Sequence, residues 1–159
     1  MDEKEIFELL YRDSAQTKLD SSKRDLKFGV KKSFRKYQDV EYGINPTIQV
    51  QVQYNAHENF EDFFKSQSDE ANYFLKYFKS AKFIEAPKKI SIDGIESIHY
   101  SLGYEKTLND SVYKVRVRAY LIPNGETLFQ ITLNDSEDRD CSKTYDSIVK
   151  TICLNKNHP

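Results

Sequence analysis

Histidine and cysteine are the side chains with which this chain could most readily do nucleophilic or metal chemistry, and they are scattered. The three histidines, His57, His99 and His158, show no His-x3-His spacing, and the two cysteines, Cys141 and Cys153, show no Cys-x2-Cys spacing. Zinc sites and Cys–His nucleophilic pairs need such groups brought together. We therefore predict structural or incidental roles for the histidines and no metal or cofactor site.

Carboxylates are the next candidates, and Asp135, Glu137, Asp138 and Asp140 form the densest cluster. A calcium site is one interpretation, but the spacing lacks the central glycine and the terminal glutamate of an EF-hand loop. Acidic residues in the first turn of a helix offset the positive end of its macrodipole, and this alone explains the cluster. No other carboxylates are paired as a general acid and base would be. The sequence thus predicts no catalytic residues.

A row of basic side chains is the remaining candidate for a functional surface. Lys114, Arg116 and Arg118 alternate with apolar residues along one predicted strand, and Tyr120 continues the same face. This basic row suits docking of a protein partner, because tyrosine and arginine are enriched at interfaces. It equally suits a solvated face that acids on adjacent strands balance. A third hypothesis, nucleic-acid binding, conflicts with 24 basic against 25 acidic residues and a net charge of −1.

The length and composition predict one folded domain. At 159 residues the chain can bury roughly two thirds of its unfolded surface in a single core. Its 11 tyrosines and 10 phenylalanines must supply much of that core as ring surface. No apolar run approaches the ~20 residues of a membrane-spanning helix, and no signal-peptide pattern opens the chain. We expect a soluble domain. Whether Met1 is the native start or was added to a trimmed mature form stays open.

Apolar spacing predicts the elements of the first half of the chain. An amphipathic helix over 2–12 and a polar loop form an N-terminal region, 1–24, and a strand follows it. Strict alternation of apolar residues with glutamines from 48 to 54 predicts the next strand. Apolar residues, most of them phenylalanines, then recur at spacings of three and four within 58–80. Ser68, followed by two acids, is typical of a helix start, so two short helices are predicted there.

An antiparallel meander is predicted for the second half, after Pro87 ends the helical region. Strands are expected at 88–92, 95–106, 113–121 and 127–133, joined by turns at Asp93-Gly94, Asn109-Asp110 and Asn124-Gly125. A closing helix carries Tyr145 on its apolar stripe, which Cys141 and Cys153 are expected to share. Twelve residues of helix separate those cysteines by about 18 Å, too far for a disulfide bridge. The tail, 155–159, is expected to fray.

The order of these elements resembles the PsbP-like fold, which the Ran-binding Mog proteins and DcrB-type bacterial proteins share. Particular stretches resemble it as well: Gly94-Ile95-Glu96-Ser97 at the start of a long strand, 113–120 ahead of Asn124-Gly125, 128–132, and 145–152 as the last helix. The resemblance implies one α+β domain over 25–154, an α/β/α sandwich in which helices flank the antiparallel sheet. A cystatin-like fold is the main structural alternative.

The resemblance also implies a non-catalytic binding or accessory domain, because members of the fold dock onto larger assemblies and supply no catalytic constellation to carry over. The basic row would then meet a protein partner. Such bacterial domains often follow a signal peptide, which favours the cell envelope or secretion over the cytoplasm. The alternative is a small-ligand-binding or hydrolytic domain of cystatin-like build, with a cavity that holds His99. No nucleic acid, membrane span or cofactor is expected, and the oligomeric state stays open.

Overall fold

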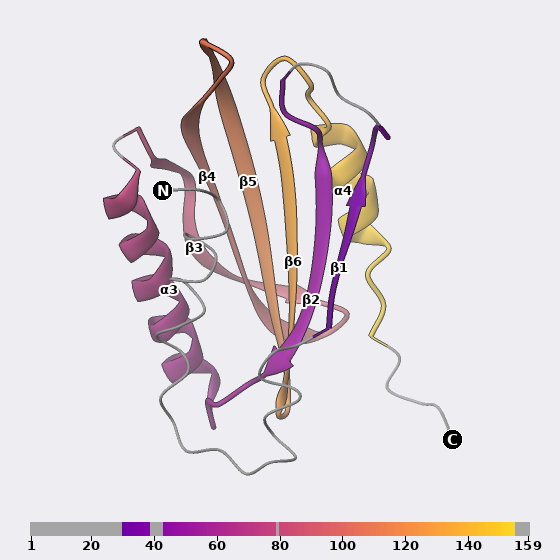
Figure 1. The fold of residues 1–159 in the computed structure, drawn as a ribbon. Helices are drawn as coiled ribbons and strands as arrows, with labels where there is room; N and C mark the ends of the chain where they lie inside the picture. The colour runs from indigo at the N-terminus through magenta and orange to yellow at the C-terminus, as the bar shows by residue number, and fades with distance from the viewer. Residues whose placement is uncertain (1–29, 39–42, 79, 155–159) are drawn as a thin grey trace.

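Six strands and two helices make up the described part of the chain. The computed structural model describes residues 30–38, 43–78 and 80–154 (Figure 1). The elements are β1 (Val30–Arg35), β2 (Thr47–Tyr54), α3 (Phe60–Tyr77), β3 (Lys82–Ile92), β4 (Ile95–Leu108), β5 (Ser111–Asn124), β6 (Thr127–Ser136) and α4 (Ser142–Lys150). The predicted helix at 2–12, with the rest of 1–24, and the predicted frayed tail at 155–159 lie outside the described residues.

The six strands form one antiparallel sheet in the order β1-β2-β6-β5-β4-β3. β3 to β6 are successive neighbours, which confirms the predicted meander, and β2 joins it by pairing with β6. The first two meander turns fall where they are predicted. Asp93 and Gly94 have φ of 49° and 76°, and Asn109 and Asp110 have φ of 48° and 62°. These positive values are those that a two-residue hairpin turn requires, and asparagine, aspartate and glycine adopt them most readily.

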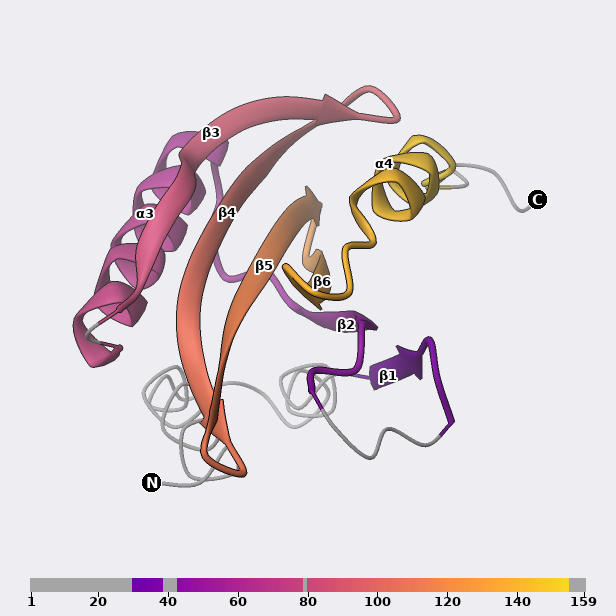
Figure 2. The same cartoon turned by 90° about the horizontal axis from the view of Figure 1, so that it is seen from above.

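Helices cover both faces of this sheet, as Figure 2 shows. On one face, α3 packs over a buried cluster made of Phe63, Ile98, Leu121 and Leu128. On the other face, α4 packs over a second cluster, whose buried members are Ile92, Tyr120, Ile122, Leu133, Cys141 and Tyr145. The predicted α+β class and the α/β/α sandwich are therefore confirmed.

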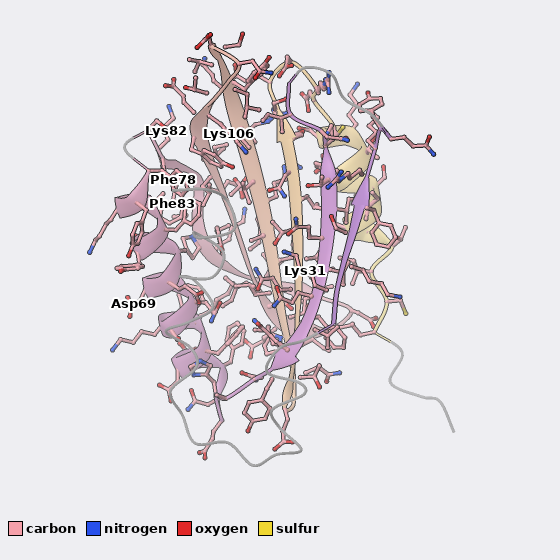
Figure 3. All side chains as sticks on the ribbon, in the orientation of Figure 1. Lys31, Asp69, Phe78, Lys82, Phe83 and Lys106 are labelled. Carbon is pink, nitrogen blue, oxygen red and sulfur yellow. The ribbon has the colours of Figure 1, made fainter. Side chains whose placement is uncertain are left out.

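Aromatic rings continue the α3 layer along the helix. The ring centroids of Phe78 and Tyr104 are 5.1 Å apart, and those of Phe83 and Tyr100 are 6.4 Å apart (Figure 3). Burial raises the pKa of Tyr100 well above its usual range. On this face, phenylalanine and tyrosine supply much of the packing, as the composition predicts.

α3 is one helix, so the prediction of two short helices was wrong. It begins after Asn59, whose side-chain oxygen accepts a hydrogen bond from the Asp62 amide at 2.9 Å. Ser68 lies inside the helix rather than at the start of another. Phe63 and Ala71, both buried, lie eight residues apart and therefore on the same face. The apolar face thus continues through the polar stretch that resembles a helix start.

β3 also differs from the prediction, because it begins at Lys82 and runs through Pro87 rather than starting after it. Proline has no amide hydrogen to donate, which a strand at the edge of a sheet tolerates. The pairing with β4 shifts register between Phe83 and Glu85 and again between Glu85 and Lys88. Pro87 therefore lies in a bulged stretch of an edge strand. At the other edge of the sheet, β1 carries the basic residues Lys31, Lys32 and Arg35.

The closing helix is shorter than predicted. Cys141 takes the N-cap position of α4 and is buried, whereas Cys153 lies beyond the end of the helix and is exposed. Neither of these two cysteines forms a disulfide bond. The prediction that Cys153 shares the apolar stripe was therefore wrong, while Tyr145 is buried there as expected. Within the described residues, no helix combines the length and apolar character needed to cross a membrane.

Truncation of Phe63 tests the α3 layer of the core. This side chain is 1% exposed, so Phe63→Ala should leave a cavity and lower the free energy of unfolding by about 3–5 kcal/mol. Urea unfolding followed by circular dichroism measures the loss. Lys65→Ala, on the exposed side of the same helix, is the matched control and should change stability by less than about 0.5 kcal/mol. Equal effects of the two substitutions would contradict the packing described here.

Candidate functional site

The basic row lies on the α4 side of the sheet, where its cations face acidic partners. Lys114 Nζ lies 3.4 Å from a Glu137 carboxylate oxygen, with both side chains more than half exposed. Arg118 Nη1 donates to Asp146 Oδ1, on α4, at 2.7 Å. The carboxylates of Glu137 and Asp146 therefore neutralise Lys114 and Arg118, two cations of the basic row.

Arg116, the middle residue of the row, holds the most buried of these pairs. Its Nε and Nη2 atoms donate to the two carboxylate oxygens of Asp135 at 2.9 Å each, and Asp135 is only 2% exposed. Asp135 also accepts a hydrogen bond from the Cys141 amide at 2.8 Å. Asp140 lies 2.9 Å from Arg116 and accepts from the Ser142 amide at 2.8 Å. We call this set the Arg116 clamp, and it fixes the start of α4 against β5.

The Arg116 clamp corrects the interpretation of the acidic cluster. The first turn of α4 contains no acidic residue, so Asp135 and Asp140 do not act as first-turn acids. Asp135 belongs to β6, and Asp140 lies just before the helix. Hydrogen bonds from Ser142, together with the Arg116 guanidinium, lower the pKa of Asp140 well below its usual range. Among the described residues, no group of three or more metal-binding side chains forms a metal site.

Tyr120 and His99 extend the same face toward the β3 edge, and both are buried. Tyr120 is 8% exposed, and its ring stacks on the His99 ring with centroids 4.4 Å apart. His99 Nδ1 lies 3.0 Å from the Ala119 carbonyl oxygen, and Nε2 lies 3.2 Å from a Glu85 carboxylate oxygen. His99 is therefore enclosed by its neighbours, and Tyr120 presents little of its ring on the face that continues the basic row.

Opposing effects act on the protonation of His99. The Ala119 carbonyl and the Glu85 carboxylate are both acceptors, so only the doubly protonated ring can donate to both. Burial acts in the other direction and is the larger effect, so the pKa of His99 is lowered. Glu85 has a second partner, Lys88 at 2.6 Å, whose hydrogen bond lowers the pKa of Glu85. Glu85 can therefore stay ionised when His99 is neutral.

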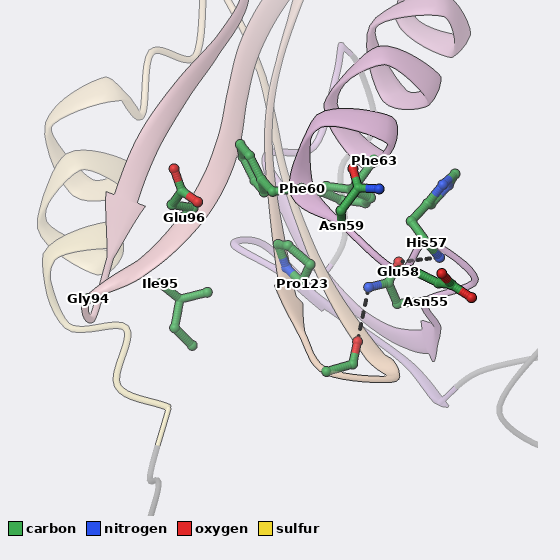
Figure 4. Close-up of a pocket in the computed structure, with 11 residues that line it drawn as sticks. Asn55, His57, Glu58, Asn59, Phe60, Phe63, Gly94, Ile95, Glu96 and Pro123 are labelled. Carbon is green, nitrogen blue, oxygen red and sulfur yellow. Dashed lines mark hydrogen bonds between the residues drawn. The ribbon is translucent and has the colours of Figure 1, made fainter.

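A hollow of about 440 Å³ opens at the end of the sandwich where three turns of the chain meet (Figure 4). We call it the three-turn hollow. The β2–α3 connection, the β3–β4 turn and the β5–β6 turn line it, through Asn55, His57, Glu58, Asn59, Phe60, Phe63, Gly94, Ile95, Glu96, Pro123 and Gly125. Its volume lies within the range of pockets that bind small molecules or a few side chains. His99 is not among its lining residues.

Asn55 ties two of these turns together. Its side-chain amide donates to the Gly125 carbonyl at 2.9 Å, and its backbone amide donates to the Glu126 carbonyl at 2.8 Å. The Asn55 side-chain oxygen in turn accepts from the His57 amide at 3.2 Å. Asn55 is itself 8% exposed, so these hydrogen bonds are shielded from water. The wall of the hollow is thus set by the fold rather than by a loop that moves independently.

Apolar and polar groups divide the lining. Phe60 and Pro123 form an apolar floor with the buried Phe63 nearby, and Ile95, which also packs against the α4-side cluster, adds apolar surface at the edge of the hollow. The His57 ring packs edge-on against Phe63 with centroids 5.8 Å apart. Asn59, which is hydrogen-bonded to Asp62, and the exposed carboxylates Glu58 and Glu96 complete the polar part of the lining. Neither carboxylate has an ion-pair partner among the described residues. The hollow can therefore bind apolar surface while placing negative charge at its rim.

No local motif in the sequence marks this hollow, although the order of the strands gives one signal for it. Successive turns of an antiparallel meander alternate between the two ends of the sheet, so the turns at Gly94 and Gly125 must share an end. His57 and Phe60 follow β2, whose last residue, Tyr54, pairs with Thr127 at that same end. His57 and Phe60 reach that end only because β2 pairs with β6. The alternation of apolar and polar residues along β2 does not predict which strand it pairs with.

Known proteins resemble this chain in structure rather than in sequence. No family profile and no curated protein matches the chain. Among solved structures, PA94 of Pseudomonas aeruginosa, a protein of unknown function, gives a TM-score of 0.63 at 11% identity, over 81% of this chain and 85% of that one. The two chains share a fold. This likeness shows nothing beyond that architecture.

Two further solved structures match with lower scores. LpqN of Mycobacterium tuberculosis is a protein involved in cell envelope biogenesis. It matches with a TM-score of 0.44 at 15% identity, over 66% of this chain and 59% of LpqN. The cyanobacterial PsbP protein CyanoP of Synechocystis matches with a TM-score of 0.40 at 16% identity, over 77% of this chain and 78% of CyanoP. A member of the PsbP family, which the order of elements resembles, is thus among the matches.

Removal of Arg116 tests the clamp. Arg116→Met leaves the Asp135 carboxylate buried without its cation, so the free energy of unfolding should fall by about 3 kcal/mol. Lys114→Met is the matched control: its partner pair is exposed, and the loss should be below about 1 kcal/mol. Denaturant unfolding of both variants measures this difference. A loss at Arg116 no larger than that at Lys114 would show that the clamp does not hold α4.

Acidification should reveal the buried His99. Because the folded chain has the lower His99 pKa, the unfolded chain binds more protons between that pKa and about 6.5. Stability should therefore rise with pH across this window and be lost as the pH falls through it. His99→Gln should flatten that part of the profile, since glutamine can still donate to the Ala119 carbonyl but does not titrate.

Urea unfolding between pH 5 and 8, for both proteins, measures this slope. Glu85, Lys88 and Arg118 are the charged groups that face His99, and they remain in the variant. An unchanged slope in His99→Gln would assign the pH dependence to groups other than His99.

Proposed function

We propose that this protein is a non-catalytic binding domain that holds a segment of a protein partner in the three-turn hollow. The observation that carries the proposal is a hollow of about 440 Å³ with an apolar floor and two rim carboxylates, Glu58 and Glu96, that form no ion pair within the described part of the chain. Concave sites in which a few polar groups converge beside apolar surface are a usual form of binding site. The ties made by Asn55 support the proposal, because a preformed wall loses little conformational entropy when it binds.

Docking through the basic row is the second candidate, and it stays a proposal. Lys114 and Glu137 are 62% and 61% exposed, so that end of the row is open to a partner. Arg116 and Arg118 are 24% and 23% exposed, and their acidic partners compete with any external carboxylate. Tyr120 offers little surface. The three-turn hollow needs no existing ion pair to break, and we prefer it for that reason.

The small-ligand or hydrolytic hypothesis centred on His99 also remains a proposal, with less support than either docking surface. The His99 ring is enclosed by Tyr120, Glu85 and the Ala119 carbonyl. A substrate would have to displace one of these neighbours to reach an imidazole nitrogen. The three-turn hollow has its own histidine, His57, but the proposal gives it only a place in the wall.

Photo-cross-linking in the cells that make this protein discriminates between the two docking surfaces. A chain with p-benzoylphenylalanine in place of Glu58 should give an ultraviolet-dependent cross-linked species, because that residue lies at the rim of the hollow. The matched variant carries the same group in place of Lys114, which is equally exposed but lies on the basic row. Denaturing gels and mass spectrometry identify the products.

Cross-linking at position 58 but not at position 114 would support the three-turn hollow. The reverse pattern would overturn it in favour of the basic row. Circular dichroism of both variants shows that a negative result does not come from unfolding, since both replaced side chains are exposed.

A further inference from the structure

We infer that the segment bound in the three-turn hollow is basic, with an apolar side chain between two cationic ones. This inference rests on the proposed function and adds the chemistry of the ligand. Glu58 and Glu96 come from different turns and lie on opposite sides of Phe60 and Pro123 in Figure 4. A segment that fills the apolar floor would therefore present its flanking residues to a carboxylate on each side.

The charge around the hollow favours a cationic ligand. Of the residues that the structure describes, no lysine or arginine lines it. Lys89 lies beside it, over the Phe60 and Phe64 rings at 5.6 and 5.3 Å, but its Nζ is bonded to Glu61 Oε1 at 2.5 Å. The pairing neutralises Lys89 and leaves the rim carboxylates as the net charge. A cation already resting on the Phe60 ring also shows that these rings accept positive charge.

The N-terminus of α3 is the one opposing influence within this part of the structure, and it is the weaker one. A helix end carries about half a positive charge. Asn59 caps it by accepting from the Asp62 amide, and the first turn contains the acidic residues Glu61 and Asp62. Two full carboxylates at Glu58 and Glu96 outweigh a half charge that is already capped. An anionic ligand would thus meet net repulsion.

The apolar floor sets the central residue of the ligand. Phe60 is half-buried, with its ring 6.0 Å from that of Phe63 and 6.5 Å from that of Phe64. Pro123 and Ile95 add aliphatic surface from the other two turns. An aromatic or long aliphatic side chain gains contact with all three turns at once. Glycine at that position would lose this contact and leave only exposed ion pairs, which contribute little.

A tripeptide titration tests the inference on the full-length chain. Acetylated and amidated Lys-Phe-Lys should shift the amide resonances of Asn55, Gly94 and Gly125 in ¹⁵N-labelled protein, whereas Glu-Phe-Glu and Lys-Gly-Lys should not. The double variant Glu58→Lys with Glu96→Lys should bind Lys-Phe-Lys about tenfold more weakly and gain binding of Glu-Phe-Glu, because two attractions become repulsions. The control is Asp69→Lys with Glu105→Lys, which makes the same change in charge at exposed residues outside the hollow. It should keep the wild-type preference for Lys-Phe-Lys over Glu-Phe-Glu.

The outcomes separate this inference from the proposed function. Equal binding of Lys-Phe-Lys by the double variant and the wild type would overturn the basic-ligand inference while leaving the hollow as a docking site. Cross-linking at position 58 without any amide resonance shift caused by Lys-Phe-Lys would likewise overturn the basic-ligand inference and leave the hollow as a docking site. Shifts confined to the basic row, together with cross-linking at position 114, would overturn both.

Discussion

Burial of β5 on both faces is the constraint on which the rest of this structure depends. Ala119, Tyr120, Leu121 and Ile122 are consecutive and all buried, so neighbouring side chains point into different cores. One face needs α3 and the other needs α4. Because α4 covers the face that bears the basic row, charged groups there must be paired where they are buried. The Arg116 clamp meets that requirement and anchors α4 as well.

Much of the fold can be predicted because period-two alternation and turn residues are local signals. Asp93-Gly94 and Asn109-Asp110 mark turns through backbone values that few other residues adopt. The errors arise where tertiary contacts override local preference. Ser68 resembles a helix start, yet Phe63 and Ala71 hold one continuous helix against the sheet. Pro87 resembles a strand boundary, yet an edge strand accepts it within a bulge.

The functional surfaces were harder to predict because they depend on partners far apart in the chain. Alternation shows that Arg116 and Tyr120 share a face, but not that α4 covers it. The partner of Arg116 lies nineteen residues away on β6, and nothing local identifies Asp135 as that partner. The three-turn hollow likewise joins Glu58 and Glu96 only through strand order.

Hydrogen–deuterium exchange of the full chain, with and without the partner that cross-links at position 58, tests the central claim most directly. The three-turn hollow predicts new protection of backbone amides in the connection after β2 and in the turns around Gly94 and Gly125. Amides around Lys114 and along α4 should keep their exchange rates. Protection confined to β5 and α4, with the three turns unchanged, would contradict the account.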